Sequence, residues 1–190
     1  MDVQVLVPMK TTALGVAELN KLLQSVMNPS SYLKKEYVSG ATVFREGDKI
    51  MQIRNNYKVE WRKPEINGQF EEGIGVFNGD FGTILRLIPN EKTAVICFDD
   101  GRVAEYAYAQ FEELDLAYCI TIHKSQGSEF RTVILPLAGG PVPLLTRNLL
   151  YTAVTRAKKL VYCIGRPETI ARMIANAQRN ERNTGLLQRL

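Results

Sequence analysis

The chain has 190 residues, of which 45% are hydrophobic and 23% charged, with a formal net charge of +4 and a pI of about 9.0. This composition is typical of a globular protein with a buried core and excludes a disordered chain, while the small positive excess favours a polyanionic partner without requiring one. No run approaches the ~20 apolar residues that span a bilayer and no secretory signal opens the sequence, so we expect a cytoplasmic protein without a membrane partner.

The N-terminal region predicts a strand followed by an amphipathic helix. Residues 3–7 are typical of a short buried strand that ends at Pro8, and residues 15–27 carry Val and Leu at helical spacing. Pro29 closes the helix, because proline cannot continue a helix and disfavours helical geometry in the residue before it.

Short β runs separated by glycine and Asn/Asp turns fill residues 43–116. The runs cover residues 49–53, 81–87, 93–98 and 102–106. Asp99-Asp100-Gly101 is a hairpin signal, because Asp-Gly tolerates the positive φ angles of a tight turn. We expect a small antiparallel barrel of SH3-like size, with residues 55–77 as a long exposed loop because Glu, Lys, Asn and Gly dominate them.

The C-terminal region returns to an α/β pattern. Residues 117–122 and 132–136 are mainly apolar, as in strands covered on both faces, and residues 160–164 predict a further strand. Helices are expected at residues 144–157 and 167–179. Alternating strands and helices imply a parallel sheet.

The fold class is therefore α/β, with a parallel-sheet domain interrupted by a small SH3-like antiparallel β-barrel. We assign residues 1–40 and 116–190 to the α/β domain and residues 41–115 to the insertion. Cys97, Cys119 and Cys163 are odd in number and lie in separate apolar runs, which favours reduced core thiols over disulfides. The same spacing predicts no metal site in this chain.

The segment Thr-Ile-His-Lys-Ser-Gln-Gly-Ser-Glu-Phe, residues 121–130, directly follows a predicted buried strand. At the carboxyl ends of parallel strands a loop can present side chains and free amides to a ligand, and Gly127 permits close approach of a phosphate or sugar. The simpler alternative is a polar turn in which His123 caps the local backbone.

Residues 148–159 form a second polar pattern, on a predicted helix. Leu149, Leu150 and Val154 are expected to face the sheet. The opposite face presents Thr152, Thr155, Arg156 and Lys159. An arginine at the end of such a helix can neutralise charge on a transferring phosphoryl group, although a surface arginine that complements the helix dipole explains the residue equally simply.

Residues 121–130 resemble motif V and residues 150–158 resemble motif VI of superfamily 1 helicases in the RecD, TraA and RecD-like branch, which includes the exodeoxyribonuclease V alpha subunits. The resemblance implies a RecA-like (P-loop NTPase-like) fold for the α/β domain, called 2A, and the SH3-like fold of subdomain 2B for the insertion. Weaker similarity to this family continues in residues 5–9, 15–20, 47–52, 55–57 and 78–82.

The resemblance also assigns roles. Arg156 matches the motif VI arginine that reaches the ATP γ-phosphate and is the expected catalytic residue, and Gly127 and Glu129 match positions near the nucleotide. The motif V positions expected at single-stranded DNA or in its coupling to ATP are Thr121, His123, Lys124, Ser125 and Gln126. In the barrel the expected strand contacts are Arg54, Tyr57, Lys58 and Arg62, with Lys63 and Trp61 as further candidates, Trp61 being equally suited to packing.

The sequence lacks the Gly-x-x-x-x-Gly-Lys-Ser/Thr string that cradles phosphates and the acidic motif for magnesium. We therefore expect ATP and Mg²⁺ to be held mainly by an N-terminal P-loop motor domain of the same parent polypeptide, and this chain alone to be inactive as an ATPase. Single-stranded DNA and that domain are the expected partners. The sequence leaves open whether other nuclease or helicase subunits join them.

The favoured function is an ATP-dependent DNA helicase or translocase, with the 5′ to 3′ polarity that the resemblance implies. The alternative is a non-enzymatic module that binds single-stranded nucleic acid. A small-molecule hydrolase or transferase is not favoured, because His123 is the only histidine and has no cysteine or acid at a recognised spacing.

Overall fold

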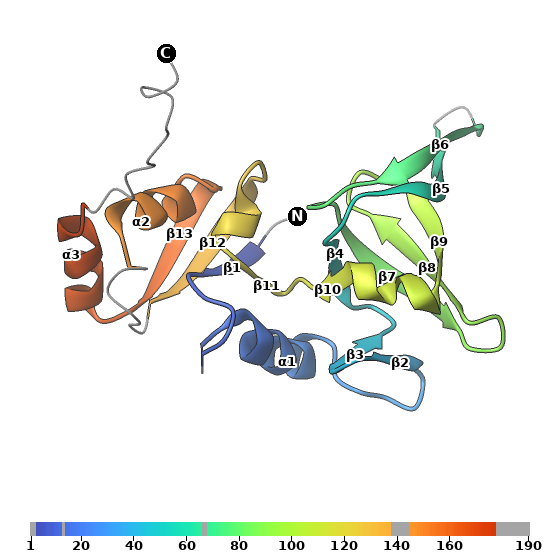
Figure 1. Cartoon of the computed structure of the whole chain (residues 1–190), viewed down its shortest axis with the longest axis horizontal. Coiled ribbons are helices and arrows are strands. Elements are labelled where there is room, and N and C mark those ends of the chain that lie inside the picture. Colours follow the sequence, from blue (N-terminus) through green and yellow to red (C-terminus); the bar gives the residue numbers. More distant parts are fainter. Residues whose placement is uncertain (1–2, 13, 66–67, 138–144, 178–190) are drawn as a thin grey trace, which may run out of the picture.

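The computed structural model describes residues 3–12, 14–65, 68–137 and 145–177. Its elements form two lobes, an α/β lobe made from the two ends of the chain and a β lobe made from the middle (Figure 1). The predicted α/β class, with a parallel sheet and a separate antiparallel sheet, is confirmed. Within the ranges just given, no helix is both long and apolar enough to cross a membrane.

The sheet of the α/β lobe has the strand order β11-β1-β12-β13, and its neighbouring strands are parallel. The strands are β1 (Val3–Val7), β11 (Cys119–Thr121), β12 (Phe130–Leu137) and β13 (Ala157–Gly165). Val7 pairs with Thr121 where β1 and β11 end, and Phe130 pairs with Ala157 where β12 and β13 begin. The carboxyl ends of the strands therefore lie along one side of the sheet, called the carboxyl edge, and their amino ends lie along the opposite side, called the amino edge.

Helices cover both faces of this sheet (Figure 1). They are α1 (Val16–Met27), α2 (Arg147–Val154) and α3 (Pro167–Ala175). Successive residues of β1 point to opposite faces, so Leu6 packs in the cluster with α2 and α3 while Val7 packs in the cluster with α1. Helix α3 is shorter than predicted, and residues 178 and 179 of that prediction lie outside the described residues.

One predicted contact of α2 is wrong. Leu149 and Ala153 are buried against the sheet and Leu150 packs beside them, but Val154 is 40% exposed. Leu149 and Ala153 stand four residues apart on one helix face, whereas Val154 is turned by about 100° from Ala153 and ends the helix.

The β lobe is a seven-stranded antiparallel sheet of order β10-β4-β7-β8-β9-β5-β6. Its strands are β4 (Lys49–Gln52), β5 (Asn56–Pro64), β6 (Phe70–Val76), β7 (Phe81–Ile88), β8 (Thr93–Phe98), β9 (Val103–Ala107) and β10 (Leu114–Leu116), and the 3-10 helix η1 (Tyr108–Glu113) joins the last two. Gly101 has φ +89 in the predicted β8–β9 turn. The separate hairpin of β2 (Glu36–Ser39) and β3 (Thr42–Arg45) precedes this sheet.

The expected exposed loop at residues 55–77 is wrong, because most of it forms the β5–β6 ribbon. Val59 and Val76 of the ribbon are buried, and Trp61 packs partly against the core. Across the ribbon, Arg62 pairs with Glu72 at 3.1 Å on the solvent side. The charged composition that suggested a loop comes from this exposed side.

The three cysteines are free, as expected, but they are not all core residues. Cys119 is buried, Cys97 is half-buried and Cys163 is exposed. Cys163 lies on β13, an edge strand of the parallel sheet, which explains its exposure despite its apolar neighbours.

Apolar side chains connect the two lobes. Met51 and Phe81 of the β lobe pack in the core cluster of the α/β lobe, and the rings of Phe81 and Phe130 lie 5.9 Å apart at 86°. The predicted domain boundary between residues 40 and 41 falls in the β2–β3 turn, and the boundary between residues 115 and 116 falls inside β10. The division itself remains a prediction.

Candidate functional site

The segment that joins β11 to β12 runs from the carboxyl edge of the parallel sheet to its amino edge. Thr121 ends β11 at the carboxyl edge, as expected, but Gly127 and Glu129 come just before β12 and lie at the amino edge. The segment folds through the 3-10 helix η2 (His123–Ser125), where the Lys124 amide donates to Thr121 Oγ1 at 3.2 Å. The motif V residues therefore do not form one cluster at the carboxyl ends of the strands.

Arg156 lies beside the amino-edge part of this segment. Its Nη1 donates to the Ser128 carbonyl at 3.3 Å, and its own carbonyl accepts from the Phe130 amide at 2.8 Å. The helix α2 ends at Val154, so Arg156 stands in the turn before β13. Lys158 and Glu129 form an exposed ion pair at 3.2 Å in the same place.

Gly127 completes this group. Its φ of +88 belongs to the left-handed region that favours glycine, and a side chain there would meet open space. A guanidinium, a carboxylate and an uncovered backbone turn are thus close together at the amino edge. Such a group can hydrogen-bond to phosphate oxygens through Arg156 and to hydroxyls through Glu129.

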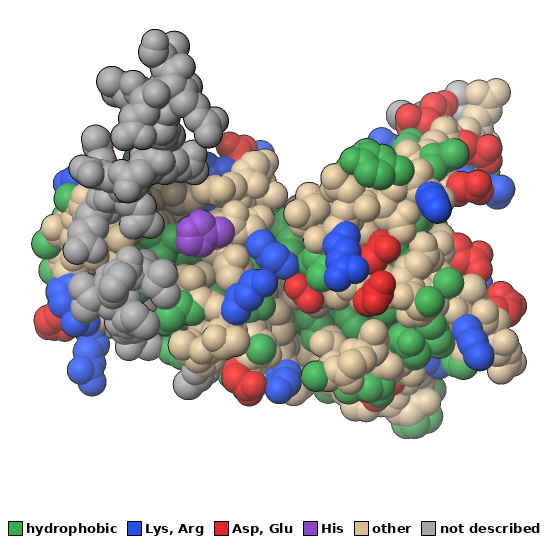
Figure 2. All heavy atoms as spheres, viewed as in Figure 1, with side chains coloured by type: hydrophobic (Ala, Val, Ile, Leu, Met, Phe, Trp, Pro, Cys, Tyr) green, Lys and Arg blue, Asp and Glu red, His purple; other side chains and the backbone are tan. Residues whose placement is uncertain are grey.

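The remaining motif V residues differ in their exposure. His123 and Gln126 are exposed. The space-filling view shows a notch between the two lobes (Figure 2). Lys124 is half-buried and its Nζ lies 3.0 Å from Asp115. Ser125 is fully buried and its hydroxyl donates to the Ile122 carbonyl at 2.6 Å, so this side chain is engaged within the protein. Thr121 is also buried.

The barrel candidates divide between the start and the middle of β5. Arg54, Tyr57 and Lys58 are exposed at its start, and Arg62 is exposed but paired with Glu72 further along. Trp61 Nε1 donates to the Gly75 carbonyl at 3.1 Å and the guanidinium of Arg102 lies 5.6 Å from its ring, which indicates a packing role. The half-buried Lys63 follows.

Phe77 is a further candidate that the sequence analysis missed. Its ring is 44% exposed and meets the 68% exposed ring of Tyr57 at 5.8 Å and 75°. Asn55 orients this pair, since it donates to the Tyr57 hydroxyl at 3.3 Å and accepts from the Asn78 amide at 2.9 Å. The sequence signal was available, because Phe77 stands directly before the Asn-Gly-Asp turn that ends the ribbon.

A cleft of about 500 Å³ lies between α1 and the segment that enters motif V. Its lining includes Thr121 and Lys124, together with Lys10 and Lys21, which no sequence pattern singled out. In the part of the chain that the structure describes, no three His, Cys, Asp or Glu side chains are placed to hold a metal ion.

Two models of known protein families match this chain, one over its middle and one over its C-terminal part. Residues 19–98 match the SH3 domain of ATP-dependent RecD-like DNA helicases, and residues 116–164 match the UvrD-like helicase C-terminal domain. The chain is therefore similar to RecD-like and UvrD-like helicases over two successive segments.

Curated relatives agree with this assignment. The chain is 35% identical over 188 residues to the ATP-dependent RecD2 DNA helicase of Deinococcus radiodurans, covering 99% of the chain and 23% of that protein. It is 39% identical over 118 residues to the RecBCD enzyme subunit RecD of Mycobacterium tuberculosis, covering 62% of the chain and 20% of the subunit. The chain thus spans less than a quarter of the length of these relatives.

Solved structures share the fold. A crystal structure of the Pif1 helicase from Bacteroides in complex with ADP-AlF3 and ssDNA superposes with a TM-score of 0.56 at 17% identity, covering 97% of this chain and 44% of that one. Pif1 helicase from Candida albicans gives 0.55 at 14% identity, covering 93% and 48%.

Proposed function

We propose that this chain closes the ATP site and holds the single strand of an ATP-dependent DNA helicase, working opposite a P-loop motor domain. The observation that carries the proposal is the position of Arg156. Its guanidinium donates a hydrogen bond to the Ser128 carbonyl, next to Gly127 and Glu129. This position is at the amino edge of the sheet, which a second domain can face.

In this proposal Arg156 reaches the γ-phosphate of ATP bound to the facing domain. Its fork of N–H donors stabilises charge that develops on the transferred group. Gly127 and Glu129 border the nucleotide. Mg²⁺ supplies further charge neutralisation at the phosphates and is held by the P-loop domain, since Glu129 is already paired with Lys158 in this chain.

Single-stranded DNA is proposed to lie across both lobes. His123, Lys124 and Gln126 would act from the α/β lobe, and Arg54, Tyr57, Lys58 and Arg62 from the β lobe. Thr121 and Ser125 would act indirectly, because their side chains are buried and hold the turn that presents their neighbours. Translocation from 5′ to 3′ rests on the family resemblance.

A non-enzymatic strand-binding module is the second candidate. It is favoured by one observation, the lack of a P-loop string within these 190 residues. Both candidates predict strand binding, but only the motor requires Arg156.

The test is the rate of ATP turnover, with single-stranded DNA present, for this chain joined to its P-loop domain. We expect Arg156→Ala to lower turnover by ~10³ to 10⁵, the range measured for arginine fingers, while strand affinity stays near wild type. The matched control is Arg172→Ala, an exposed arginine on α3. Equal turnover in the Arg156 variant and the wild type would leave the binding module as the better function.

A further inference from the structure

Helix α1 buries a row of amides where an amphipathic helix usually buries apolar side chains. Asn20, Gln24 and Asn28 follow one another at four-residue spacing, so they share one face of the helix and its C-terminal cap, and all three are buried. This amide row points at the junction between the two lobes. Asn20 Nδ2 donates to the carbonyls of Leu116 and Cys119, each at 2.9 Å.

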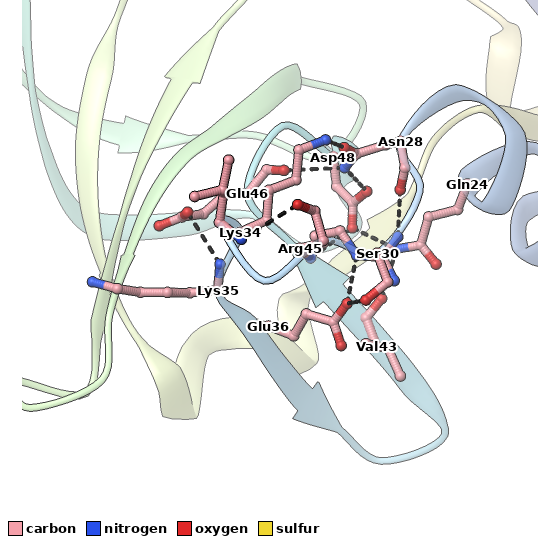
Figure 3. Close-up of polar contacts among 12 residues, drawn as sticks. Gln24, Asn28, Ser30, Lys34, Lys35, Glu36, Val43, Arg45, Glu46 and Asp48 are labelled. Atoms are coloured by element: carbon pink, nitrogen blue, oxygen red, sulfur yellow. Dashed lines mark hydrogen bonds and ion pairs between the residues drawn. The ribbon is translucent and has the colours of Figure 1, made fainter.

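The amide row ends on Asp48, a fully buried carboxylate in the turn before β4 (Figure 3). Gln24 Nε2 and Asn28 Nδ2 each donate to it at 2.6 Å, and the Arg45 amide donates at 2.7 Å. The hydroxyl of Tyr118 donates at 2.9 Å from the other side. Asp48 thus holds together a helix of the α/β lobe, the start of the β lobe and the strand that leads to Thr121.

No ion pair with Asp48 occurs among the described residues. Two cationic side chains instead contact Asn28, which accepts from Lys34 at Oδ1 and from Arg45 at its carbonyl. Arg45 itself pairs with Glu36 on β2 at 2.6 Å. Burial and the Asp48 charge raise the pKa of Tyr118, which keeps its hydroxyl protonated as a donor.

Burying a carboxylate between two lobes costs desolvation free energy, and apolar side chains of similar size are often at least as stabilising. Directional hydrogen bonds provide something that apolar contacts do not. Each donor satisfies the carboxylate in only one arrangement, so a fully satisfied network selects that arrangement over its alternatives.

We propose that Asp48, the amide row and Tyr118 form a joint that fixes the β lobe relative to motif V, so that one DNA strand contacts both lobes at once. Asp48 is then a positioning residue that touches no nucleotide. The inference rests on the proposed strand binding and adds the device that couples its two halves.

The test compares single strands of two lengths, thymidine oligonucleotides of ~4 and ~16 nucleotides, by fluorescence anisotropy. The longer strand should gain about a hundredfold in affinity in the wild type, because the second lobe binds at a high effective concentration. Asp48→Asn replaces one carboxylate oxygen, which accepts hydrogen bonds, with an amide N–H₂ group that donates them. This group would then face the donors of Gln24, Asn28 and Tyr118. The substitution should lower the affinity for the longer strand about tenfold and leave the affinity for the shorter strand unchanged. Tyr118→Phe should lower the affinity for the longer strand by a smaller factor.

Ile96→Val is the matched control, since it removes one methyl group from the buried core of the β lobe without touching the joint. It should leave both affinities unchanged. Equal binding of the longer strand by Asp48→Asn and the wild type would overturn the joint, whereas failure of the wild type to bind either strand would overturn the proposed function itself.

A second measurement tests the joint without DNA. In a Cys97→Ser background, spin labels on the exposed Cys163 and on a cysteine introduced at the exposed Glu91 report the distance between the lobes. Asp48→Asn should broaden this distance distribution. An unchanged width would overturn the inference even if strand binding were altered.

Discussion

The exposed candidate side chains on β5 and beside it are of two chemical kinds, and each should affect strand binding differently. Lys58 has no ion pair among the described residues, whereas Arg62 is held by Glu72 at 3.1 Å. A free ammonium replaces counterions on a phosphate, while Arg62 must first leave its carboxylate. Tyr57 and Phe77 instead offer rings on which bases stack, a contact that depends little on salt.

We therefore expect Lys58→Ala to lower the slope of log affinity against log salt by ~0.7, the value for one phosphate contact on a single strand, and Arg62→Ala to lower it less. Tyr57→Ala or Phe77→Ala should cost ~1 to 3 kcal/mol of binding without changing the slope. Anisotropy titrations at several KCl concentrations separate these effects. Lys92→Gln, on the exposed β7–β8 turn, is the control. A slope that is unaltered in Lys58→Ala would show that Lys58 does not contact the strand.

The roles that motif strings assign to residues remain predictions, and the strings did not predict which of those residues are exposed. The string around Ser125 identifies a helicase-like turn, yet the 3-10 geometry that buries this hydroxyl depends on how the segment crosses the sheet. For the same reason the sequence did not separate Thr121, at one edge, from Gly127 and Glu129, near the other.

At the scale of the element, strands with apolar runs were predictable and the β5–β6 ribbon was not. β1, β8 and β12 carry apolar runs that only a strand or buried helix explains. The ribbon has one face in solvent, so its polar residues resemble those of a loop. A glycine inside a strand, such as residue 73, is explained only by the neighbour that packs against it.

That neighbour is Trp61. A Cβ built on Gly73 would lie 2.3 Å from Trp61 Cζ2, so the indole covers the bare backbone of the opposite strand. We expect Gly73→Ala to displace the ring and destabilise the protein by ~1 to 3 kcal/mol. Urea unfolding followed by the fluorescence of Trp61, the only tryptophan, measures this. Glu71→Ala on the same strand is the control, and an equal midpoint for Gly73→Ala would show that the indole does not need this space.

At the scale of the whole molecule, the return of the α/β pattern after residue 116 predicted that both chain ends share one sheet. The junction between the lobes was not predictable. Its polar half consists of Asn, Gln and Asp, residues that sequence patterns assign to the surface because they are mostly exposed in proteins. Its apolar half places Met51 and Phe81 of the β lobe in the core of the other lobe, which requires knowing how two sheets meet.

Since the lobes share this core, we expect them to unfold in one transition. Trp61 fluorescence reports the β lobe, and thiol labelling of Cys119 reports the α/β lobe once Cys97 and Cys163 are changed to serine. Cys119 is fully buried, and this burial also raises the pKa of its thiol to about 12, so we expect labelling to require unfolding. The two urea midpoints should coincide in the wild type, which is one test of two-state behaviour.

Two Phe→Leu substitutions distinguish a shared core from two independent ones. Phe98→Leu lies inside the β-lobe core and should lower both midpoints together, because its destabilisation is transmitted through the intact junction. Phe81→Leu removes the ring that meets Phe130 and should separate the two midpoints. Separate midpoints in the wild type would mean that the lobes fold independently, and the junction would then orient them without contributing to their stability.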